Sequence, residues 1–403
     1  MHLKPHFKPH LTRRVWEKPS LVSTEGHRKV SWLELFFDLF FVVTVSQLAH
    51  GLVGNTGGGE VRAYLLLFVP VWWMWVGTTI YMERFETEGL ETRVMYFALM
   101  FPVAGLAVFA HSAFSYGAVG FGLSYIAGRV IITLLWARAS IHSPEFRPTG
   151  WIFILGFSMS IVLFVISLWT SQETRSALWG AGLFIDLITP WFTLKRQRKL
   201  PRMSTSKFPE RLGLFILIVL GESIVGVVNG IASAPRLDTS AIIPASLGIA
   251  VGFGLWWVYF DYVARRVPKR TVLSSILWSY LHLPLAMGIA AIGAAITNAI
   301  LHNAGSVIVN PSPLLLGAAG VTLLSMGGLE RTLHREGDEP THPVISPLMK
   351  VTAGLLLLGL VPFSDALPIV SAFFAVLAVL LVQMLYGLWV WFTEGHGEAG
   401  SGE

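Results

Sequence analysis

The chain has no cysteine and few charged residues. Among its 403 residues, Asp, Glu, Lys and Arg together make up only 13%, and Cys is absent. The missing thiols exclude disulfides, thiolate catalysis and cysteine-ligated metal clusters. Soluble domains carry about 25% charged residues. The composition therefore indicates that water is not the main solvent of this protein.

Familiar catalytic motifs are missing as well. The sequence contains no Walker loop, no His-Glu-x-x-His motif and no Gly-x-Ser-x-Gly motif. His2, His6 and His10 are regularly spaced, but a proline precedes each of the last two and opposes a helix, so we expect no metal site there. We also expect no cofactor. The first thirty residues lack the apolar core of a cleavable signal peptide.

Apolar residues dominate what is present. They make up 54% of the chain, and the mean hydropathy is +0.63. Segments of about twenty apolar residues, each long enough to cross a bilayer as a helix, recur along the chain. The sequence therefore predicts an all-α integral membrane protein with about twelve transmembrane helices, at residues 31–53, 62–82, 92–110, 118–140, 151–170, 176–194, 210–230, 241–263, 272–300, 313–333, 346–361 and 367–392.

The two sets of six helices resemble each other. Trp72 in the second segment corresponds to Trp256 in the eighth, and Pro102 in the third corresponds to Pro284 in the ninth. Two units with an even number of helices share one orientation, so we predict two parallel six-helix repeats. The predicted parts are a tail at 1–30, repeats at 31–194 and 210–392, a basic linker at 195–209 and an acidic tail at 393–403.

The basic residues indicate the topology. The net charge is +5, but most Lys and Arg residues lie in short connectors, so they indicate orientation and not a nucleic-acid partner. They concentrate before residue 30, at 195–211 and at 265–270, whereas the opposite loops carry little beyond Arg62, Arg175 and Arg236. By the positive-inside rule we predict a multi-pass membrane protein with both termini in the cytoplasm.

Three carboxylates open membrane segments. Glu34 and Asp38 lie four residues apart, so a helix places them on one face, and Glu210 opens the seventh segment. Carboxylates at membrane depth are costly and mark ion or proton pathways. These residues are therefore candidates for binding a cation or relaying protons. The alternative is that they cap the helix and pair with basic residues such as Arg211.

Glu222 and His282 are candidates nearer the middle of the membrane. Glu222 shares a helical face with Arg211 and Asn229, which predicts a polar row, and His282 precedes Pro284 at a predicted kink. Counting from the start of each segment places Glu222 and His282 in one layer, so we predict that this pair marks the functional centre. The alternatives are a buried structural hydrogen bond and a satisfied packing histidine.

Arg129 and Asp186 lie near the centres of the fourth and sixth segments. Either charge alone would be costly at that depth. The sequence favours a buried ion pair that joins the two helices over a role in transport.

Several of these motifs resemble one bacterial family. They are the runs Glu-Leu-Phe-Phe-Asp-Leu-Phe-Phe-Val at 34–42, Glu-Arg-Leu-Gly-Leu-Phe at 210–215, Leu-Gly-Glu-Ser at 220–223, Trp-Trp-Val-Tyr-Phe at 256–260 and Leu-His-Leu-Pro at 281–284. Together they resemble the bacterial low temperature requirement protein A family. The resemblance implies a multi-spanning inner-membrane protein linked to growth in the cold, with no established biochemical activity.

Three function classes stay open. A transporter or channel for a small solute or ion is favoured, because paired helical repeats with polar residues near the midplane are typical of transporters. A membrane-embedded enzyme acting on a lipid or isoprenoid would use Glu34, Asp38 and Glu210 at the cytoplasmic surface. A non-catalytic membrane-adaptation protein is the third class. The expected partners are the lipid bilayer and the solute or ion, and a homo-oligomer is compatible with the sequence.

Overall fold

The computed structural model describes residues 18–21, 30–85, 89–201, 207–306, 309–335 and 341–394. Twelve long helices account for most of these residues: α1 (Trp32–His50), α2 (Gly58–Arg84), α3 (Leu90–Phe109), α4 (Ala118–His142), α5 (Arg147–Ser167), α6 (Gln172–Phe192), α8 (Lys207–Ser233), α9 (Thr239–Tyr259), α10 (Val272–Asn303), α11 (Ser312–Thr332), α12 (Ile345–Leu360) and α13 (Ile369–Glu394). Short elements extend or connect them: η1 (Ala110–Ser112), α7 (Leu194–Gln197), η2 (Phe260–Ala264) and η3 (Val361–Ala366). The described part of the chain has no β-strand, only an isolated bridge between Pro268 and Leu333.

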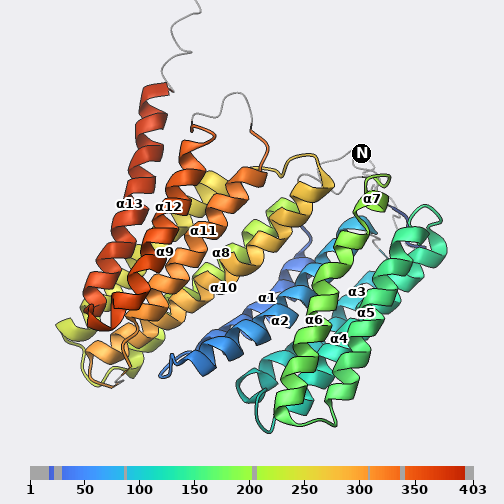
Figure 1. The fold of residues 1–403 in the computed structure, drawn as a ribbon, viewed down its shortest axis with the longest axis horizontal. Helices are drawn as coiled ribbons and strands as arrows, with labels where there is room; N and C mark the ends of the chain where they lie inside the picture. Colours follow the sequence, from blue (N-terminus) through green and yellow to red (C-terminus); the bar gives the residue numbers. More distant parts are fainter. Residues whose placement is uncertain are drawn as a thin grey trace, which may run out of the picture.

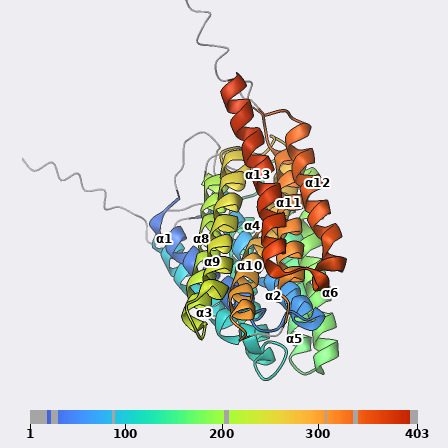
Figure 2. The same ribbon diagram turned by 90° about the vertical axis from the view of Figure 1, so that its left-hand side faces the viewer.

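The prediction of an all-α, multi-spanning membrane protein is confirmed. Eleven of the described helices are long and apolar enough to cross a membrane. The twelfth, α6, carries Glu173, Arg175 and Asp186 in its 21 residues but packs along α5 (Figure 1). Most of the long helices run along one common direction (Figure 2). The tails at 1–17, 22–29 and 395–403, and part of the predicted linker, at 202–206, lie outside the described residues.

Polar caps fix where several helices begin. Ser31 and Glu34 form a reciprocal capping box at the start of α1. Thr271 caps α10 by accepting a hydrogen bond from the backbone N–H of Ser274. Asp238 caps α9 in the exposed loop before it, and hydrogen bonds from Ser240 hold the pKa of this carboxyl below its usual range. These short-range signals explain why the predicted segments and the helices nearly coincide.

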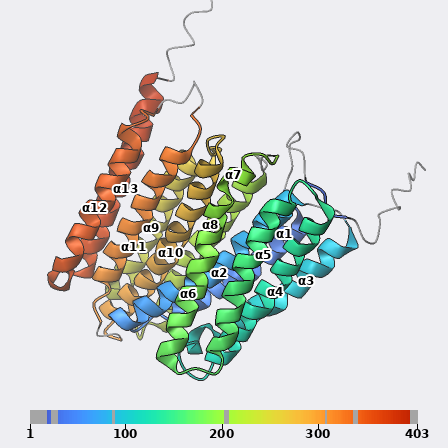
Figure 3. The same ribbon diagram turned by 45° about the vertical axis from the view of Figure 1, so that its right-hand side comes forward.

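The helices form two groups. Helices α1–α6 lie together, α8–α13 lie beside them, and the groups meet where α1 and α2 pack against α8 and α10 (Figure 3). The groups share some neighbours, since α1 packs on α3 as α8 packs on α10, but α5 lies closely along α6 whereas α12 touches α13 much less. The two parallel repeats therefore stay a prediction.

Twelve helices that alternate in direction bring the start of α1 and the end of α13 to the same end of the bundle. That end also carries Arg84, Lys195, Arg198, Lys269 and Arg270. We call it the basic end.

Candidate functional site

Four buried charges join α1 to α8 near the basic end. Arg211 binds Asp38 through two hydrogen bonds, from Nη2 to Oδ1 at 2.7 Å and from Nε to Oδ2 at 3.1 Å. Glu34 Oε1 lies 3.0 Å from Lys207 Nζ and 3.4 Å from Arg211 Nη1. None of these four side chains is more than 4% exposed. We refer to Glu34, Asp38, Lys207 and Arg211 as the α1–α8 charge cluster.

The cluster is balanced and hydrogen-bonded. The Trp75 indole N–H donates to Asp38 Oδ1 at 2.8 Å, and the Tyr96 hydroxyl lies 3.3 Å from Glu34 Oε1. Two carboxylates and two cations carry no net charge between them, which is the condition for burying them without a large cost. This geometry matches the capping and pairing alternative more closely than an open cation site. Glu210, in contrast, is exposed on α8 and outside the cluster.

Glu222 also lies where the two helix groups meet. The Ser46 hydroxyl of α1 donates a hydrogen bond to Glu222 Oε1 at 2.6 Å, and the glutamate is half-buried. Asn229, two turns further along α8, is exposed, whereas Arg211 is buried in the charge cluster. The three residues therefore do not form the continuous polar row that the spacing predicts.

His282 is fully buried and has a partner at each ring nitrogen. Nδ1 lies 2.7 Å from the carbonyl oxygen of Trp278, and Nε2 lies 3.1 Å from the hydroxyl of Tyr259. A neutral imidazole with its proton on Nδ1 satisfies both contacts, because Nε2 then accepts from Tyr259. This is the arrangement of a packing histidine.

Glu222 and His282 do not share a layer. Phe208 of α8 packs on Trp278 of α10 with ring centroids 5.5 Å apart, and Gly293 of α10 lies against the backbone of Glu222. Gly293 is eleven residues beyond His282, or about 16 Å along the helix. The expectation of a common layer was wrong because depth was counted from the apparent start of each segment, which does not give the register between packed helices.

Arg129 and Asp186 meet between α4 and α6. Arg129 Nη2 lies 2.5 Å from Asp186 Oδ1, and both side chains have no exposed surface. Asp186 Oδ2 also accepts hydrogen bonds from Tyr125 at 2.7 Å and Ser160 at 2.9 Å. Arg129 Nε and Nη1 have no hydrogen-bond partner among the described residues, and the guanidinium lies 4.0 Å from the centre of the Phe157 ring.

A third buried pair, which was not predicted from the sequence, lies in the second helix group. Lys350 Nζ of α12 lies 2.9 Å from Glu330 Oε2 of α11, 3.0 Å from the Ser346 hydroxyl and 3.6 Å from the centre of the Tyr262 ring. The signal that could have found it is the one that found Arg129 and Asp186, namely opposite charges in neighbouring apolar segments.

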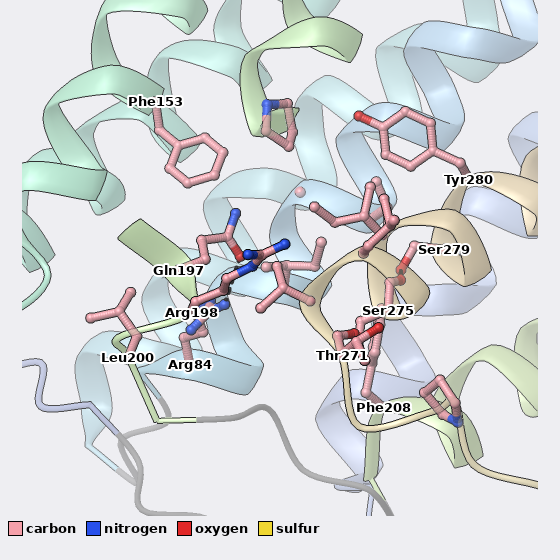
Figure 4. Close-up of a pocket in the computed structure, with 18 of the residues that line it drawn as sticks. Arg84, Phe153, Gln197, Arg198, Leu200, Phe208, Thr271, Ser275, Ser279 and Tyr280 are labelled. Carbon is pink, nitrogen blue, oxygen red and sulfur yellow. Dashed lines mark hydrogen bonds between the residues drawn. The ribbon is translucent and has the colours of Figure 1, made fainter. Parts of the chain in front are cut away.

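A cavity of about 730 Å³ lies between the two helix groups. Helices α2, α4 and α5 and the residues around α7 line one side, and the starts of α8 and α10 with the loop before α10 line the other. Figure 4 shows Arg84, Gln197 and Arg198 on one side, opposite Thr271, Ser275 and Ser279. The cavity begins among exposed residues of the basic end, including Arg198 and Arg270.

Aromatic side chains form the inner part of the cavity. Trp72 and Trp73 line it twelve and eleven residues from the end of α2, a depth of about 18 Å. Trp73 packs on Tyr280, with ring centroids 5.6 Å apart, and the Tyr280 hydroxyl donates to the carbonyl oxygen of Leu187 on α6. The cavity therefore ends about halfway along α2, where these contacts join α2, α6 and α10.

Beyond the inner end of the cavity, hydrogen bonds join the two helix groups. Asn298 of α10 accepts from the backbone N–H of Gly54 at 2.7 Å and donates to the carbonyl oxygen of Leu52 at 2.8 Å. The Tyr64 hydroxyl of α2 donates to the carbonyl oxygen of Met287 at 2.7 Å. Towards the basic end the cavity separates α2, α4 and α5 from α10, while the α1–α8 charge cluster still joins the two groups there. Beyond the cavity these hydrogen bonds close the groups together.

Comparison with known proteins identifies the family. The family model described as bacterial low temperature requirement A protein (LtrA) matches residues 29–390, almost the whole chain. The chain belongs to the LtrA family. The resemblance of the five sequence motifs to this family is therefore confirmed.

One relative of this LtrA-family chain is an uncharacterized protein, RA0937, of Rhizobium meliloti (strain 1021). It is 26% identical over 321 residues, which cover 74% of each chain. No solved structure matches the chain. The family and the relative show a bacterial multi-pass membrane protein, and the function has to be argued from the cavity and the charges around it.

Proposed function

We propose that this protein is a transporter that works by alternating access, with the cavity as the route by which a small solute enters from the cytoplasm. The observation that carries the proposal is the cavity itself, which runs from the basic end to about mid-membrane between two helix groups that are bonded together beyond it. Transporters place substrate sites near the midplane between two such units, which rock against each other around the site.

The charge distribution supports a cytoplasmic basic end. Lys195, Arg196, Arg198, Lys269 and Arg270 all lie there, and the positive-inside rule places such connectors in the cytoplasm. The state described here would then be open inward. Both termini would be cytoplasmic in the inner membrane.

The contacts that this movement would break or keep lie on both sides of the cavity. Opening outward would break the bonds of Asn298 to Leu52 and Gly54, while the α1–α8 charge cluster gives the groups a fixed point of contact near the basic end. Glu222, bonded to Ser46 between the groups, is the candidate carboxylate for coupling an ion to this movement.

A lipid-modifying or isoprenoid-modifying enzyme has less support. None of the described residues that line the cavity is Asp, Glu, His or Cys, so these residues offer no ordinary general base. Of the three carboxylates that such an enzyme would use, Glu34 and Asp38 are engaged with Lys207 and Arg211, and Glu210 is exposed on α8 and is not among the described lining residues of the cavity.

The absence of native cysteine allows a direct test. Ser279 lines the cavity seven residues into α10, so Ser279→Cys should react with a small membrane-impermeant thiol reagent from the cytoplasmic side of inverted vesicles. In intact, energised cells the same variant should also react from the outside, because alternating access exposes one position to both sides in turn.

Two further single-cysteine variants are matched controls. Thr271→Cys at the cavity mouth should react only from the cytoplasmic side, and Leu155→Cys, 65% exposed on the outer surface of α5, should react from neither. Labelling of Ser279→Cys from the cytoplasm alone, in energised and de-energised membranes, would show a one-sided receptor pocket and overturn the transporter.

A further inference from the structure

All of the charged side chains among the described residues that line the cavity are cations. We propose that the cavity binds an organic phosphate, with its anionic head between Arg84, Arg198 and Arg270 and its apolar part against the inner aromatic wall. This inference rests on the proposed transport route and names the chemistry of its substrate.

Four basic side chains line the outer half of the cavity, and no acidic side chain joins them among its described lining residues: Arg84, Arg198, Lys269 and Arg270. Arg84 is half-buried and bonds to a neutral acceptor, with Nη2 3.0 Å from Gln197 Oε1. Arg198 and Arg270 are exposed and have no ion-pair partner in the described part of the chain. Lys269 Nζ donates only to the carbonyl oxygen of Arg331, at 2.8 Å. Glu83 lies beside Arg84 but is not among the described lining residues, so the cations still leave an excess of positive charge around the cavity. Such an excess favours a ligand with two negative charges over a monoanion.

Two tryptophans of the inner wall have an indole N–H group without a partner among the described residues. Trp73 is 6% exposed and Trp136 is 2% exposed, both line the cavity, and neither indole Nε1 is hydrogen-bonded within the described part of the chain. Buried indole N–H groups are usually bonded. Both nitrogen atoms are themselves buried, so they become available to a ligand oxygen only when the indoles turn towards the cavity.

The volume of the cavity and its aromatic walls favour an organic ligand over a bare inorganic ion. A volume of about 730 Å³ lies within the range of pockets that hold drug-sized organic molecules. Trp72, Trp136, Phe153 and Tyr280 supply apolar and aromatic surface on both sides of the inner part. An anionic head at the mouth and an apolar body within would use both kinds of surface.

Phosphate fits the head better than carboxylate does. A phosphate monoester carries close to two negative charges at neutral pH, and arginine presents a planar fork that binds two phosphate oxygens at once. The same chemistry occurs in a water-soluble phosphate ester and in the head group of a phosphate-bearing lipid. The test therefore has an arm for each source.

The experiment measures binding to the purified full-length protein at low ionic strength. The soluble probe is 1-naphthyl phosphate, the lipid probe is dihexanoylphosphatidic acid below its micelle concentration, and the controls are 1-naphthol and inorganic phosphate. We expect at least one phosphate ester to bind about tenfold more tightly than either control. Only the esters carry both an anionic phosphate and an apolar part, whereas 1-naphthol lacks the phosphate and inorganic phosphate lacks the apolar part. The tighter of the two esters identifies the source.

Two arginines two residues apart provide a matched pair of variants. Arg198 lines the cavity and Arg196 does not, although both are exposed at the same end. Arg198→Gln should weaken binding of the phosphate ester about tenfold, as should Arg84→Gln, whereas Arg196→Gln should change the dissociation constant by less than about twofold. The bound ester should also slow thiol labelling of Ser279→Cys.

Naphthol binding as tightly as naphthyl phosphate, an equal loss in Arg196→Gln and Arg198→Gln, or no binding of either ester would each overturn the anion site. The labelling of Ser279→Cys from both sides of the membrane needs no ligand. Labelling of Ser279→Cys from both sides without binding of a phosphate ester would therefore reject the anion site and keep the transporter. Labelling from the cytoplasmic side alone, with binding of the ester, would keep the anion site and reject the transporter.

Discussion

At the scale of single residues, opposite charges in the membrane are paired between neighbouring helices. Asp38 pairs with Arg211, Asp186 with Arg129 and Glu330 with Lys350, and none of these side chains is more than 1% exposed. An isolated charge in this setting would cost several kcal/mol, whereas a hydrogen-bonded pair offsets most of that cost. Glu222 differs from them because it is half-buried and bonded to a neutral serine.

The Arg129 and Asp186 pair gives a prediction about stability. Arg129→Met should lower the melting temperature and the membrane yield strongly, since an unpaired buried carboxylate costs about 3–5 kcal/mol. Adding Asp186→Asn should recover much of the loss, because the amide removes the charge and still accepts from Tyr125 and Ser160. Thermal unfolding of the purified single and double variants in one detergent measures both effects. A double variant no more stable than Arg129→Met would show that the two residues do not act as a pair.

At the scale of elements, small residues set how closely helices approach. A Cβ added at Gly226 of α8 would lie 2.8 Å from the backbone oxygen of Gly293 on α10, and Thr297 already donates to the carbonyl oxygen of Gly226 at 3.0 Å. Close helix crossings at small residues are typical of membrane proteins. The α8–α10 contact therefore depends on the missing side chain.

Gly226→Ala should lower the melting temperature, because the new methyl group meets a backbone atom that cannot rotate away. Gly221→Ala is the matched control on the same helix, since its Cβ would meet no atom within 4 Å. That change should leave stability equal or slightly higher, as alanine is the better helix former. Thermal unfolding of the two purified variants measures the effect. An equal fall in melting temperature in both would contradict the dependence of the α8–α10 crossing on Gly226.

At the scale of the whole molecule, the even number of long helices and the basic end predict the topology. A fluorescent protein that matures only in the cytoplasm, fused after residue 403, should be fluorescent. Alkaline phosphatase inserted in the loop between α1 and α2, at Asn55, should be active, whereas the same insertion after Arg198 should be inactive. The opposite pattern of activities would show that the protein has the inverse orientation in the membrane, with the mouth of the cavity outside.

The amino-acid sequence determined the fold class, because each helix that crosses a bilayer must satisfy its own backbone and cover itself with apolar side chains. That requirement is local, so the segments, the possible cap at Glu34 and the opposite charges of Arg129 and Asp186 were visible along the chain. The depth of Glu222 relative to His282 was not, because it depends on the register between α8 and α10.

The tertiary structure alone decided which residues surround the cavity. Arg198 and Arg270 appeared in the sequence as topology signals and Trp72 as a mark of a repeat, whereas Arg84 carried no signal. Arg84 and Trp72 lie on α2, Arg198 follows α7, and Arg270 precedes α10. They line one cavity because α2 and the residues around α7 stay apart from α10 towards the basic end, while the two helix groups pack together beyond the cavity. Such a juxtaposition of distant segments is set by side-chain packing between helices, and no spacing within one segment carries it.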